Sequence, residues 1–592
     1  MTKKNRKLRI LWCGEASFLK TGYSIYAKEV LTRLYQTEKY EIAELACYAS
    51  HDDPRLQEVP WRVYPNLPIN DREKSEYALN QSYQFGENKF DYVCLDFRPD
   101  VVIDIRDWWM MEYQSRSTLR KFYKWAIMPT VDSKPQQEQF INSYLDADAV
   151  FTYSEFGKDV LESESNNHIK IKAIASPGAD FNKLKPVSNK SQHRMSFGFS
   201  ENINVFGTVM RNQRRKLYPN LIESFRNMID LNPELSKNTF LYLHTSYPDL
   251  GWELPYFIRL NNMGNHILLT YKCRDCGYCF PSFYQDSVCV CPRCNKKSCQ
   301  LPSTSFGVTT EELSHIINFF DLYIQYSVCE GFGMPQVEAA ACGVPVITVK
   351  YSAMESVGKK LKADFVEPSS FFWDSPTHSK RAIPNDKQLV EKMARFAKLP
   401  KSMKSKKGMD AYMGAKKNYT WEKCSKKWEE YLDSVELVDH ALSWDSDARL
   451  HSPLLEIPEN IPTNRDFIEW AVDNVWGKPE NKNSYTAMRM LRDLNNGKAI
   501  SSSEGVYYNE LSYIANQAQQ SPYTIQEAAN QLLMLCEASN DIESTRDIIS
   551  KFCVDVDKES LNKYGYIDIN SIEDARCEFL SKTKPDNRDI LK

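Results

Sequence analysis

The chain has 592 residues, a formal net charge of -3 and 26% charged residues. This length is too great for one hydrophobic core, so about three or four structural units are expected. The chain therefore lacks the overall excess of basic residues that is typical of nucleic-acid-binding proteins. Local basic patches are compatible with this net charge.

The sequence contains no membrane-spanning segment, since no run of about 18 apolar residues occurs. Residues 1–9 carry five basic side chains and precede a single short apolar run, which indicates a solvated tail and not a signal peptide. Nine of the 16 cysteines are scattered among apolar neighbours. Such scattering suits free thiols in a reducing compartment, so a cytoplasmic location is expected.

Residues 1–185 alternate short apolar runs with helical or loop segments. This alternation predicts a parallel, doubly wound α/β sheet whose ligands bind at the carboxyl ends of the strands. The expected strands are 8–13, 42–47, 92–97, 101–105, 124–128 and 149–153. Three acids follow such strand ends and are candidates for a site: Asp104, Asp107 and Asp132.

The loop after the first strand passes through Gly22 and leads into an amphipathic helix at about 24–35. It lacks a complete G-x-G-x-x-G, so a plain strand-to-helix turn is an alternative to phosphate binding. Trp108 and Trp109 follow Asp107 and offer either a stacking surface for a ring or buried packing.

A polar linker at 183–193 leads into a second alternating unit, residues 196–420, whose first strand is 203–210. This strand runs into M-R-N-Q-R-R-K, which ends just before a helix that starts near Tyr218. Four cations at this position can neutralise a pyrophosphate without a metal: Arg211, Arg214, Arg215 and Lys216. The alternative is a solvated basic turn.

Two C-x2-C pairs lie within the second unit, at 271–300. Paired thiolates on tight turns with this spacing predict a structural zinc ribbon, ligated by Cys273, Cys276, Cys291 and Cys294. A redox pair is the competing interpretation, and Cys279, Cys289 or Cys299 could replace one of the four ligands. The ribbon has a basic edge that suits contact with nucleic acid or protein, but a small domain tied together by its metal is an equal alternative.

Residues 329–349 read C-E-G-F-G-M-P-Q-V-E-A-A-A-C-G-V-P-V-I-T-V. Pro335 suits the first position of a helix and Gly343 suits the left-handed residue that ends one. A helix start after glycines presents free N–H groups to an anion, and Glu330 and Glu338 flank it with carboxylates that can take hydroxyls. The layout fits a nucleotide-sugar. The alternative is an ordinary strand-turn-helix unit with exposed glutamates.

This segment closely resembles the E-x7-E segment of retaining GT-B glycosyltransferases of the glycosyltransferase 4 class. The resemblance implies that Glu330 approaches the donor sugar and that Glu338 holds the nucleotide ribose. It also implies that the backbone of the loop between them faces the sugar and the diphosphate: Gly331, Phe332, Gly333 and Met334. Gln336 stands where that family more often has an apolar residue.

Further segments are similar to the same family. Arg211 and Lys216 match its G-R-x4-K diphosphate clamp, in which Arg214 or Arg215 could replace Arg211. Asp107 lies roughly where the family has a His or Asp near the sugar, and the loop with Gly22 would cover the donor phosphates. Residues 421–437 resemble the last helix, which crosses back to the first domain. The resemblance ends before 438–592, which is expected to be a helical accessory domain for acceptor binding or assembly.

The resemblance therefore implies two Rossmann-like domains facing a cleft, with the acceptor side in residues 1–185. The expected activity is metal-independent transfer of a sugar from a nucleotide-diphosphate-sugar to an acceptor hydroxyl, with retention at the anomeric carbon. The acceptor would be a glycan, a protein or a modified base in DNA. The alternative is a non-catalytic scaffold that recognises nucleic acid or protein through the ribbon and the tail. The donor base, the sugar and the oligomeric state are left open.

Overall fold

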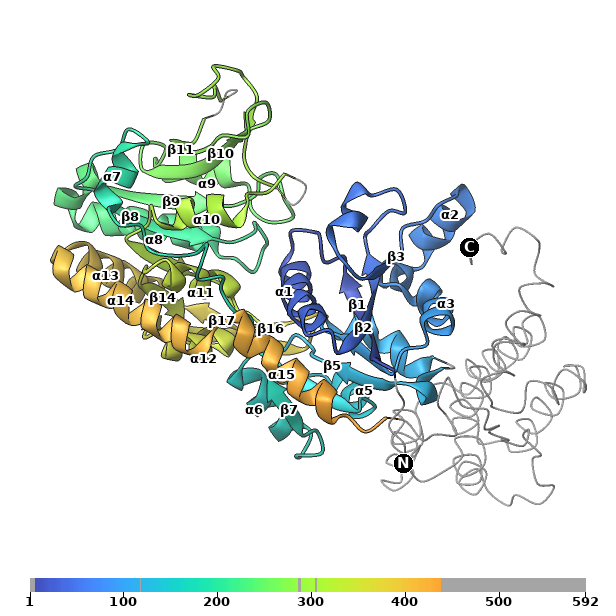
Figure 1. Cartoon of the computed structure of the whole chain (residues 1–592). Helices are drawn as coiled ribbons and strands as arrows, with labels where there is room; N and C mark the ends of the chain where they lie inside the picture. Colours follow the sequence, from blue (N-terminus) through green and yellow to red (C-terminus); the bar gives the residue numbers. More distant parts are fainter. Residues whose placement is uncertain (1–5, 118, 286–288, 304–305, 438–592) are drawn as a thin grey trace, which may run out of the picture.

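The computed structural model describes residues 6–117, 119–285, 289–303 and 306–437. Two lobes lie side by side, each built on a mostly parallel sheet with helices against it (Figure 1). The predicted fold class of two Rossmann-like α/β domains is confirmed. The expected helical domain at 438–592 lies outside the described residues. No helix within the described ranges combines the length and apolar character needed to cross a lipid bilayer.

The first lobe contains a seven-stranded parallel sheet in the order β3-β2-β1-β4-β5-β6-β7. Its strands are β1 (Leu8–Glu15), β2 (Tyr40–Cys47), β3 (Arg62–Pro65), β4 (Val101–Asp104), β5 (Lys124–Ile127), β6 (Ala149–Thr152) and β7 (Ile171–Ile174). Its helices are α1 (Gly22–Gln36), α2 (Asp71–Leu79), α3 (Glu87–Phe97), α4 (Trp108–Met111), α5 (Glu138–Leu145) and α6 (Glu155–Glu164). Both faces of β1 are buried, so its side chains are apolar almost throughout.

The second lobe contains a sheet in the order β11-β10-β9-β8-β13-β14-β15, with β12 paired to β10. Its strands are β8 (Asn204–Val209), β9 (Thr239–His244), β10 (Ile267–Cys273), β11 (Cys279–Phe283), β12 (Cys299–Gln300), β13 (Leu322–Gln325), β14 (Val346–Val349) and β15 (Asp364–Val366). All pairings are parallel except those of β11 and β12 with β10. A hairpin of β16 (Pro368–Asp374) and β17 (Ser379–Pro384) forms a separate two-stranded sheet.

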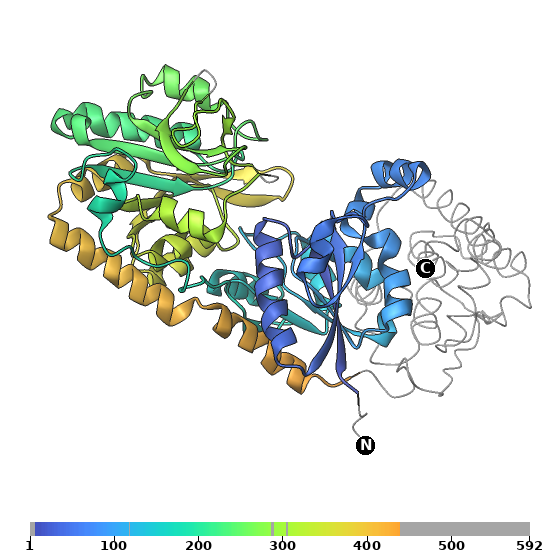
Figure 2. The same cartoon turned by 45° about the horizontal axis from the view of Figure 1, so that its top comes forward.

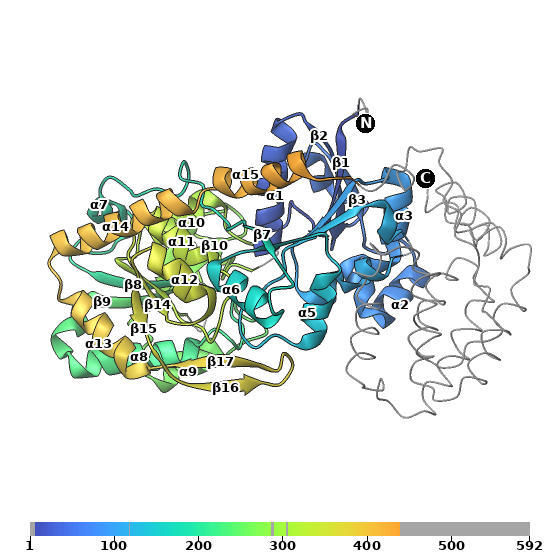
Figure 3. The ribbon, with the colours of Figure 1, turned by 90° about the horizontal axis from the view of Figure 1, so that it is seen from below.

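Two helices at the end of the described chain connect the lobes. In Figure 2, α14 (Lys401–Asn418) and α15 (Trp421–Ser434) run in line beneath both of them, and Figure 3 shows the same path from below. Trp428 of α15 donates its indole N–H to the Tyr26 hydroxyl of α1 at 2.8 Å and stacks on Phe151 with ring centroids 4.0 Å apart. The core of the first lobe is therefore completed by the end of the second.

The remaining helices lie around the second sheet and its connections: α7 (Lys190–Met195), α8 (Tyr218–Leu231), α9 (Leu254–Leu260), α10 (Thr310–Ile317), α11 (Met334–Ala341), α12 (Ser352–Lys360) and α13 (Asp386–Ala397). Short 3-10 turns occur at Pro54–Glu58, Gln81–Phe85, Glu112–Arg116, Arg120–Phe122 and Pro233–Asn238.

The strand predicted at 92–97 is wrong, because these residues belong to helix α3. Phe90, Val93, Cys94 and Phe97 of this helix are its buried residues, and their spacing of three and four is helical. The run contains enough apolar residues for a strand, but their spacing along the chain is that of a helix.

Candidate active site

Helix α11 begins directly after the E-G-F-G turn, as predicted. Gly333 before the helix has a φ of +81° and Gly343 after it has a φ of +71°, in the left-handed region that favours glycine. Pro335 lies in the first turn, where it costs no helical hydrogen bond. Within the described ranges no side chain caps this helix start, so its leading N–H groups and the positive end of its dipole can receive an anion.

Glu330 is the centre of a buried group of polar side chains just before this turn. One of its carboxylate oxygens contacts the Lys216 ammonium and accepts hydrogen bonds from Gln325 at 2.8 Å and Ser327 at 2.9 Å. The other accepts from the Arg215 guanidinium at 2.6 Å. The side chains of Glu330 and Lys216 are 6% and 8% exposed. Such a buried carboxylate is stable only because it is fully paired.

Backbone pairing brings these cations to the turn. The Val328 N–H donates to the carbonyl of Arg215 at 3.0 Å, and the Leu217 N–H donates to the carbonyl of Tyr326 at 3.3 Å. Lys216 is thereby fixed beside the residues that lead into Glu330. Burial and the neighbouring Arg215 cation lower the pKa of Lys216, whereas its ion pair with Glu330 opposes that shift.

Arg211 does not join this group. It forms a bidentate ion pair with Asp249, at 2.8 and 2.9 Å, and its side chain is 45% exposed. The residue that the structure places on Glu330 is Arg215, which the sequence offered only as a substitute for Arg211. The reason is the backbone pairing of residues 215–217 with 326–328, which begins after Arg211 has turned away.

The first lobe supplies the opposite wall of the site. The Tyr23 hydroxyl and the Thr130 hydroxyl lie 2.7 Å apart. A Cβ atom on Gly331 would lie 2.6 Å from the Thr130 methyl carbon, so only glycine permits this approach of the two lobes. Thr130 follows the end of strand β5, and the sequence analysis did not single it out, because only its distant partner gives it importance.

Asp107 lies on this wall, near Tyr23 and Thr130. Burial and the charge of Asp132 raise the pKa of Asp107 to about 6, although hydrogen bonds from Thr130 and Tyr23 and the charge of Arg215 oppose the rise. The charge of Arg215 is therefore near enough to act on Asp107, although Asp107 forms no ion pair with it among the described residues.

A latch between the lobes borders this site. Asp132 of the first lobe accepts a hydrogen bond from Arg381 of β17 at 2.6 Å and one from the Cys329 thiol at 3.2 Å. Next to it, the Ser133 and Ser379 hydroxyls lie 2.8 Å apart. The β16–β17 hairpin was not predicted, so the sequence analysis missed Arg381. The latch fixes the lobes with the turn 331–334 against Thr130.

Glu338 lies in the interior of α11 and is half-buried. Among the described residues it has no hydrogen-bond or ion-pair partner. Burial raises the pKa of Glu338 to about 7. A half-buried carboxylate without a partner is available to a ligand hydroxyl.

The loop with Gly22 approaches the second lobe from the other side. The Thr21 hydroxyl accepts a hydrogen bond from the Ser24 N–H at 3.2 Å and so caps helix α1, which begins at Gly22. The Lys20 side chain lies 3.2 Å from the position that a Cβ on Gly307 would occupy.

Phe332 of the glycine turn packs edge-on against Tyr419, with ring centroids 5.5 Å apart.

Two other candidates have structural roles. Asp104 is buried and forms an ion pair with Arg106, and it also accepts a hydrogen bond from Gln114 at 3.0 Å. Trp108 stacks on Phe140 at 4.9 Å, whereas Trp109 is half-exposed. Of the two interpretations of this tryptophan pair, packing therefore holds for Trp108.

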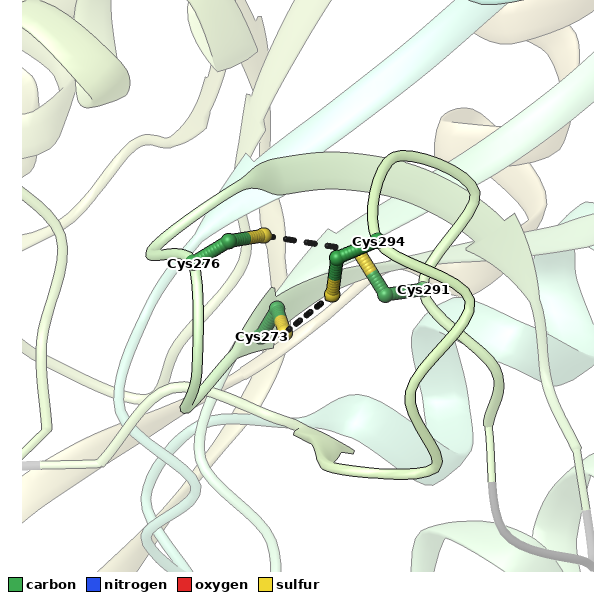
Figure 4. A group of neighbouring side chains, drawn as sticks. All are labelled: Cys273, Cys276, Cys291 and Cys294. Carbon is green, nitrogen blue, oxygen red and sulfur yellow. Dashed lines mark hydrogen bonds between the residues drawn. The ribbon is translucent and has the colours of Figure 1, made fainter.

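The four predicted metal ligands lie together between β10 and β12 (Figure 4). The sulfur atoms of Cys273 and Cys294 are 3.6 Å apart, as are those of Cys276 and Cys291, and all four lie within 4.8 Å of one another. Four sulfurs at 2.3 Å from a tetrahedral zinc would be about 3.8 Å apart, so these residues fit that ion. They leave no coordination position open for catalysis.

Lys272, next to the first of these cysteines, connects the ribbon to helix α10 and to the segment before it. Its ammonium donates to the carbonyl of Gly307 at 3.1 Å and to the carboxylate of Glu312 at 2.8 Å. Glu312 also closes a capping box with Thr309 at the start of α10. The ribbon therefore supports the segment that meets Lys20.

Residues 304–404 match the family described as Glycosyl transferases group 1. Among solved structures, the chain is similar to sucrose-phosphate synthase from Thermosynechococcus elongatus, with 14% identity, a TM-score of 0.52 and coverage of 72% of this chain and 98% of that one. It is also similar to the N-terminal domain of trehalose-6-phosphate phosphatase from Candida albicans, with 13% identity, a TM-score of 0.53 and coverage of 74% and 99%.

A third similar structure is the Anabaena protein HepE in complex with UDP-glucose, with 15% identity, a TM-score of 0.50 and coverage of 72% of this chain and 100% of that one. No curated protein matches the sequence. The structural likenesses establish the two-lobed GT-B fold, and together with the matched domain they support a transferase enzyme of the glycosyltransferase type.

Proposed function

We propose that the protein transfers a sugar from a nucleotide-diphosphate-sugar to an acceptor hydroxyl, with retention at the anomeric carbon and without a catalytic metal. The observation that carries the proposal is the group of Lys216 and Arg215 on Glu330, immediately before the uncapped start of α11. Cations and helix N–H groups converge there from two segments that are over a hundred residues apart in the sequence.

The donor diphosphate would lie between these cations and the backbone of Gly331, Phe332, Gly333 and Met334. There the fixed positive charges would stabilise the leaving diphosphate as the sugar departs, which is the task that a metal performs in other transferases. This supply of charge from the protein supports metal-independent chemistry. Membership of the retaining glycosyltransferase 4 class rests on the E-x7-E pattern.

The sugar would lie between Glu330 and Asp107, and the ribose hydroxyls would bind Glu338. These assignments follow the resemblance, and the positions of Glu330 just before the start of α11 and of Glu338 within that helix support them. Arg211 keeps a peripheral role in this proposal because it pairs with Asp249 and not with Glu330, the residue that precedes the turn 331–334. Gly22 would cover the phosphates from the first lobe through the loop that carries Lys20.

We further assign zinc to the four-cysteine cluster as a structural ion. The sulfur separations fit tetrahedral coordination. The domain boundaries expected from the sequence, at 185, 196, 420 and 437, remain part of the proposal. The expected cytoplasmic location also remains part of it. The accessory role of residues 438–592 and the acceptor class remain predictions.

The apparent donor affinity is expected to depend on pH through Glu338. The carboxylate accepts ribose hydroxyls only when it is deprotonated, so lowering the pH below about 7 protonates it and raises the KM of the donor. The rise approaches roughly tenfold per pH unit if the protonated form does not bind. Steady-state kinetics between roughly pH 5.5 and 8.5, near the range in which most proteins are most stable, measure this change in KM.

The variant Glu338→Gln is the control for this prediction. It should bind the donor more weakly at every pH and lose the dependence of KM on pH near 7. The pKa of Asp107 is raised only to about 6, so protonation of this carboxyl is expected at a lower pH and is expected to affect kcat. An unchanged KM profile in Glu338→Gln would contradict the role of Glu338.

The two arginines of the basic loop are expected to differ in effect. Replacing Arg215 by Gln removes a cation bonded to Glu330 and should lower kcat/KM by about 10²-fold. Replacing Arg211 by Gln breaks a partly exposed ion pair with Asp249 and should cost less than about tenfold. The same kinetic assay on both variants decides which arginine acts in the site. A larger effect of Arg211→Gln than of Arg215→Gln would refute this geometry.

The function as a whole is tested by a panel of nucleotide-sugars. Binding raises the melting temperature by mass action, so thermal shifts identify the donor, and hydrolysis or transfer assays with that donor then test catalysis. Failure of every nucleotide-sugar to bind would favour the scaffold hypothesis. Retention of the protein on a DNA column that collapses with added salt would favour a modified DNA base as the acceptor.

A further inference from the structure

A second pocket lies beside the basic loop, outside the site described above. It has a volume of about 640 Å³ and is open to solvent. Its principal lining residues are Arg214, Tyr247, Trp252, Tyr256, Phe257 and Arg259. Arg214 comes from the loop that follows β8, and the others come from the loop that follows β9 and from helix α9 after it. Strands β8 and β9 are adjacent and parallel. The pocket therefore lies at the carboxyl edge of the sheet, where open α/β sheets bind ligands.

Arg214 is the cation of the basic loop that the first site does not use. Arg211 is paired with Asp249, and Arg215 and Lys216 are paired with Glu330. Arg214 has no hydrogen-bond or ion-pair partner within the described parts of the chain, and it is exposed at the pocket. A guanidinium in this position can bind a phosphate through two parallel hydrogen bonds.

The rest of the wall is aromatic with a few polar groups. Trp252 and Phe257 meet edge-on at 6.0 Å, and Phe257 and Tyr256 meet edge-on at 5.2 Å. Tyr256 is 55% exposed, which leaves an aromatic surface open to a ring. The Tyr247 hydroxyl is hydrogen-bonded to the Glu253 carboxylate, and both groups line the pocket. Hydroxyl and carboxylate groups beside aromatic rings favour a hydroxylated ring over a purely apolar one.

This pocket is joined to the first site by hydrogen bonds. The Trp252 indole N–H donates to the carbonyl of Lys216 at 2.8 Å. The Asn212 side chain accepts from the Trp252 N–H at 2.9 Å and donates to its carbonyl at 2.8 Å. A Cβ on Gly251 would lie within 2.6 Å of the Asn212 backbone, so the two loops are in close contact. A shift of Trp252 would therefore act on the Lys216 backbone through this hydrogen bond.

We propose that this pocket binds a phosphorylated sugar, with its phosphate on Arg214 and its ring on Tyr256, and that occupancy is transmitted to Lys216 through Trp252. The ligand has two sources with the same chemistry: it is either the acceptor or a free effector. The binding site stands on the pocket alone, whereas the transmission to Lys216 rests on the proposed function.

The test uses the full chain and isothermal titration with glucose 6-phosphate, mannose 6-phosphate and glucose 1-phosphate. Inorganic phosphate, glucose and UMP are the comparison probes. At least one sugar phosphate should bind more tightly than phosphate or glucose alone. Arg214→Gln should weaken that binding by about tenfold or more, since it removes a charged hydrogen-bond donor. Tyr256→Ala should also weaken it. Arg226→Gln, an exposed arginine on α8, is the matched control and should leave it unchanged.

Two further measurements separate the sources of the ligand. Mass spectrometry after incubation with the donor detects a glycosylated sugar phosphate if it is the acceptor. A changed rate of donor hydrolysis without consumption of the sugar phosphate identifies an effector. Either outcome supports the site.

The inference is overturned if no sugar phosphate binds, if binding is insensitive to Arg214→Gln, or if UMP binds there more tightly than the sugar phosphates. Titration of nucleotide-sugars in the same experiment distinguishes this failure from failure of the proposed function. Donor binding without sugar-phosphate binding would contradict the second site alone. Absence of donor binding would contradict the proposed function.

Discussion

Replacing Lys216 by Met is expected to lower kcat/KM for the donor by about 10²–10³-fold, the usual cost of removing one group that stabilises charge in the transition state. Methionine keeps the unbranched stem of a side chain that is 8% exposed, so the change removes the ammonium with little change in packing. Glu330 retains Arg215, Gln325 and Ser327 as partners, which limits its loss of stability. Steady-state kinetics with the donor found in the panel measure the effect.

The matched control for this prediction is Lys350→Met. Lys350 is exposed and forms an ion pair with Glu367 at 2.9 Å, so its replacement should change activity and melting temperature little. Thermal unfolding of both variants separates loss of fold from loss of chemistry. Activity of Lys216→Met equal to that of Lys350→Met would remove Lys216 from the site.

The second large effect concerns the metal. Elemental analysis of the purified protein should find about one zinc ion per chain, and Cys276→Ser should lower this to near zero, because four-thiolate sites need all four ligands for tight binding. The ribbon should then lose its hydrogen-exchange protection. Because Lys272 bonds to Gly307 and Glu312, residues 306–317 should exchange faster as well.

Cys279→Ser is the control for the metal prediction, since Cys279 lies outside the four-sulfur cluster. It should keep the zinc content of the unmodified protein. A full zinc content in Cys276→Ser, or its loss in Cys279→Ser, would show that the ligand set is different. Faster exchange confined to the ribbon would show that it does not support α10.

The local parts of this site could be predicted from the sequence. The turn at 331–334, the helix start at Pro335 and the end at Gly343 depend on neighbouring residues, and the structure places them as expected. The four cysteines also come together as predicted, because their spacing reflects the geometry of one ion. The alternation of strands and helices predicted both sheets, although β3, β7, β9, β11, β12 and the β16–β17 hairpin were not among the expected strands.

The contacts between distant segments could not be predicted in this way. Thr130, Asp132 and Arg381 have no local pattern, since each matters through a partner in the other lobe. The choice of Arg215 over Arg211 depends on how residues 215–217 pair with 326–328, which no spacing rule contains. Residues 92–97 were misassigned for a different reason, as their helical period was present in the sequence and was overlooked.

The most direct test of the account is a crystal structure of the protein with the nucleotide-sugar that gives the largest thermal shift. We expect the diphosphate oxygens to lie within hydrogen-bonding distance of Lys216, Arg215 and the N–H groups of the turn 331–334. A donor bound with its diphosphate on Arg211, or away from α11 altogether, would contradict it.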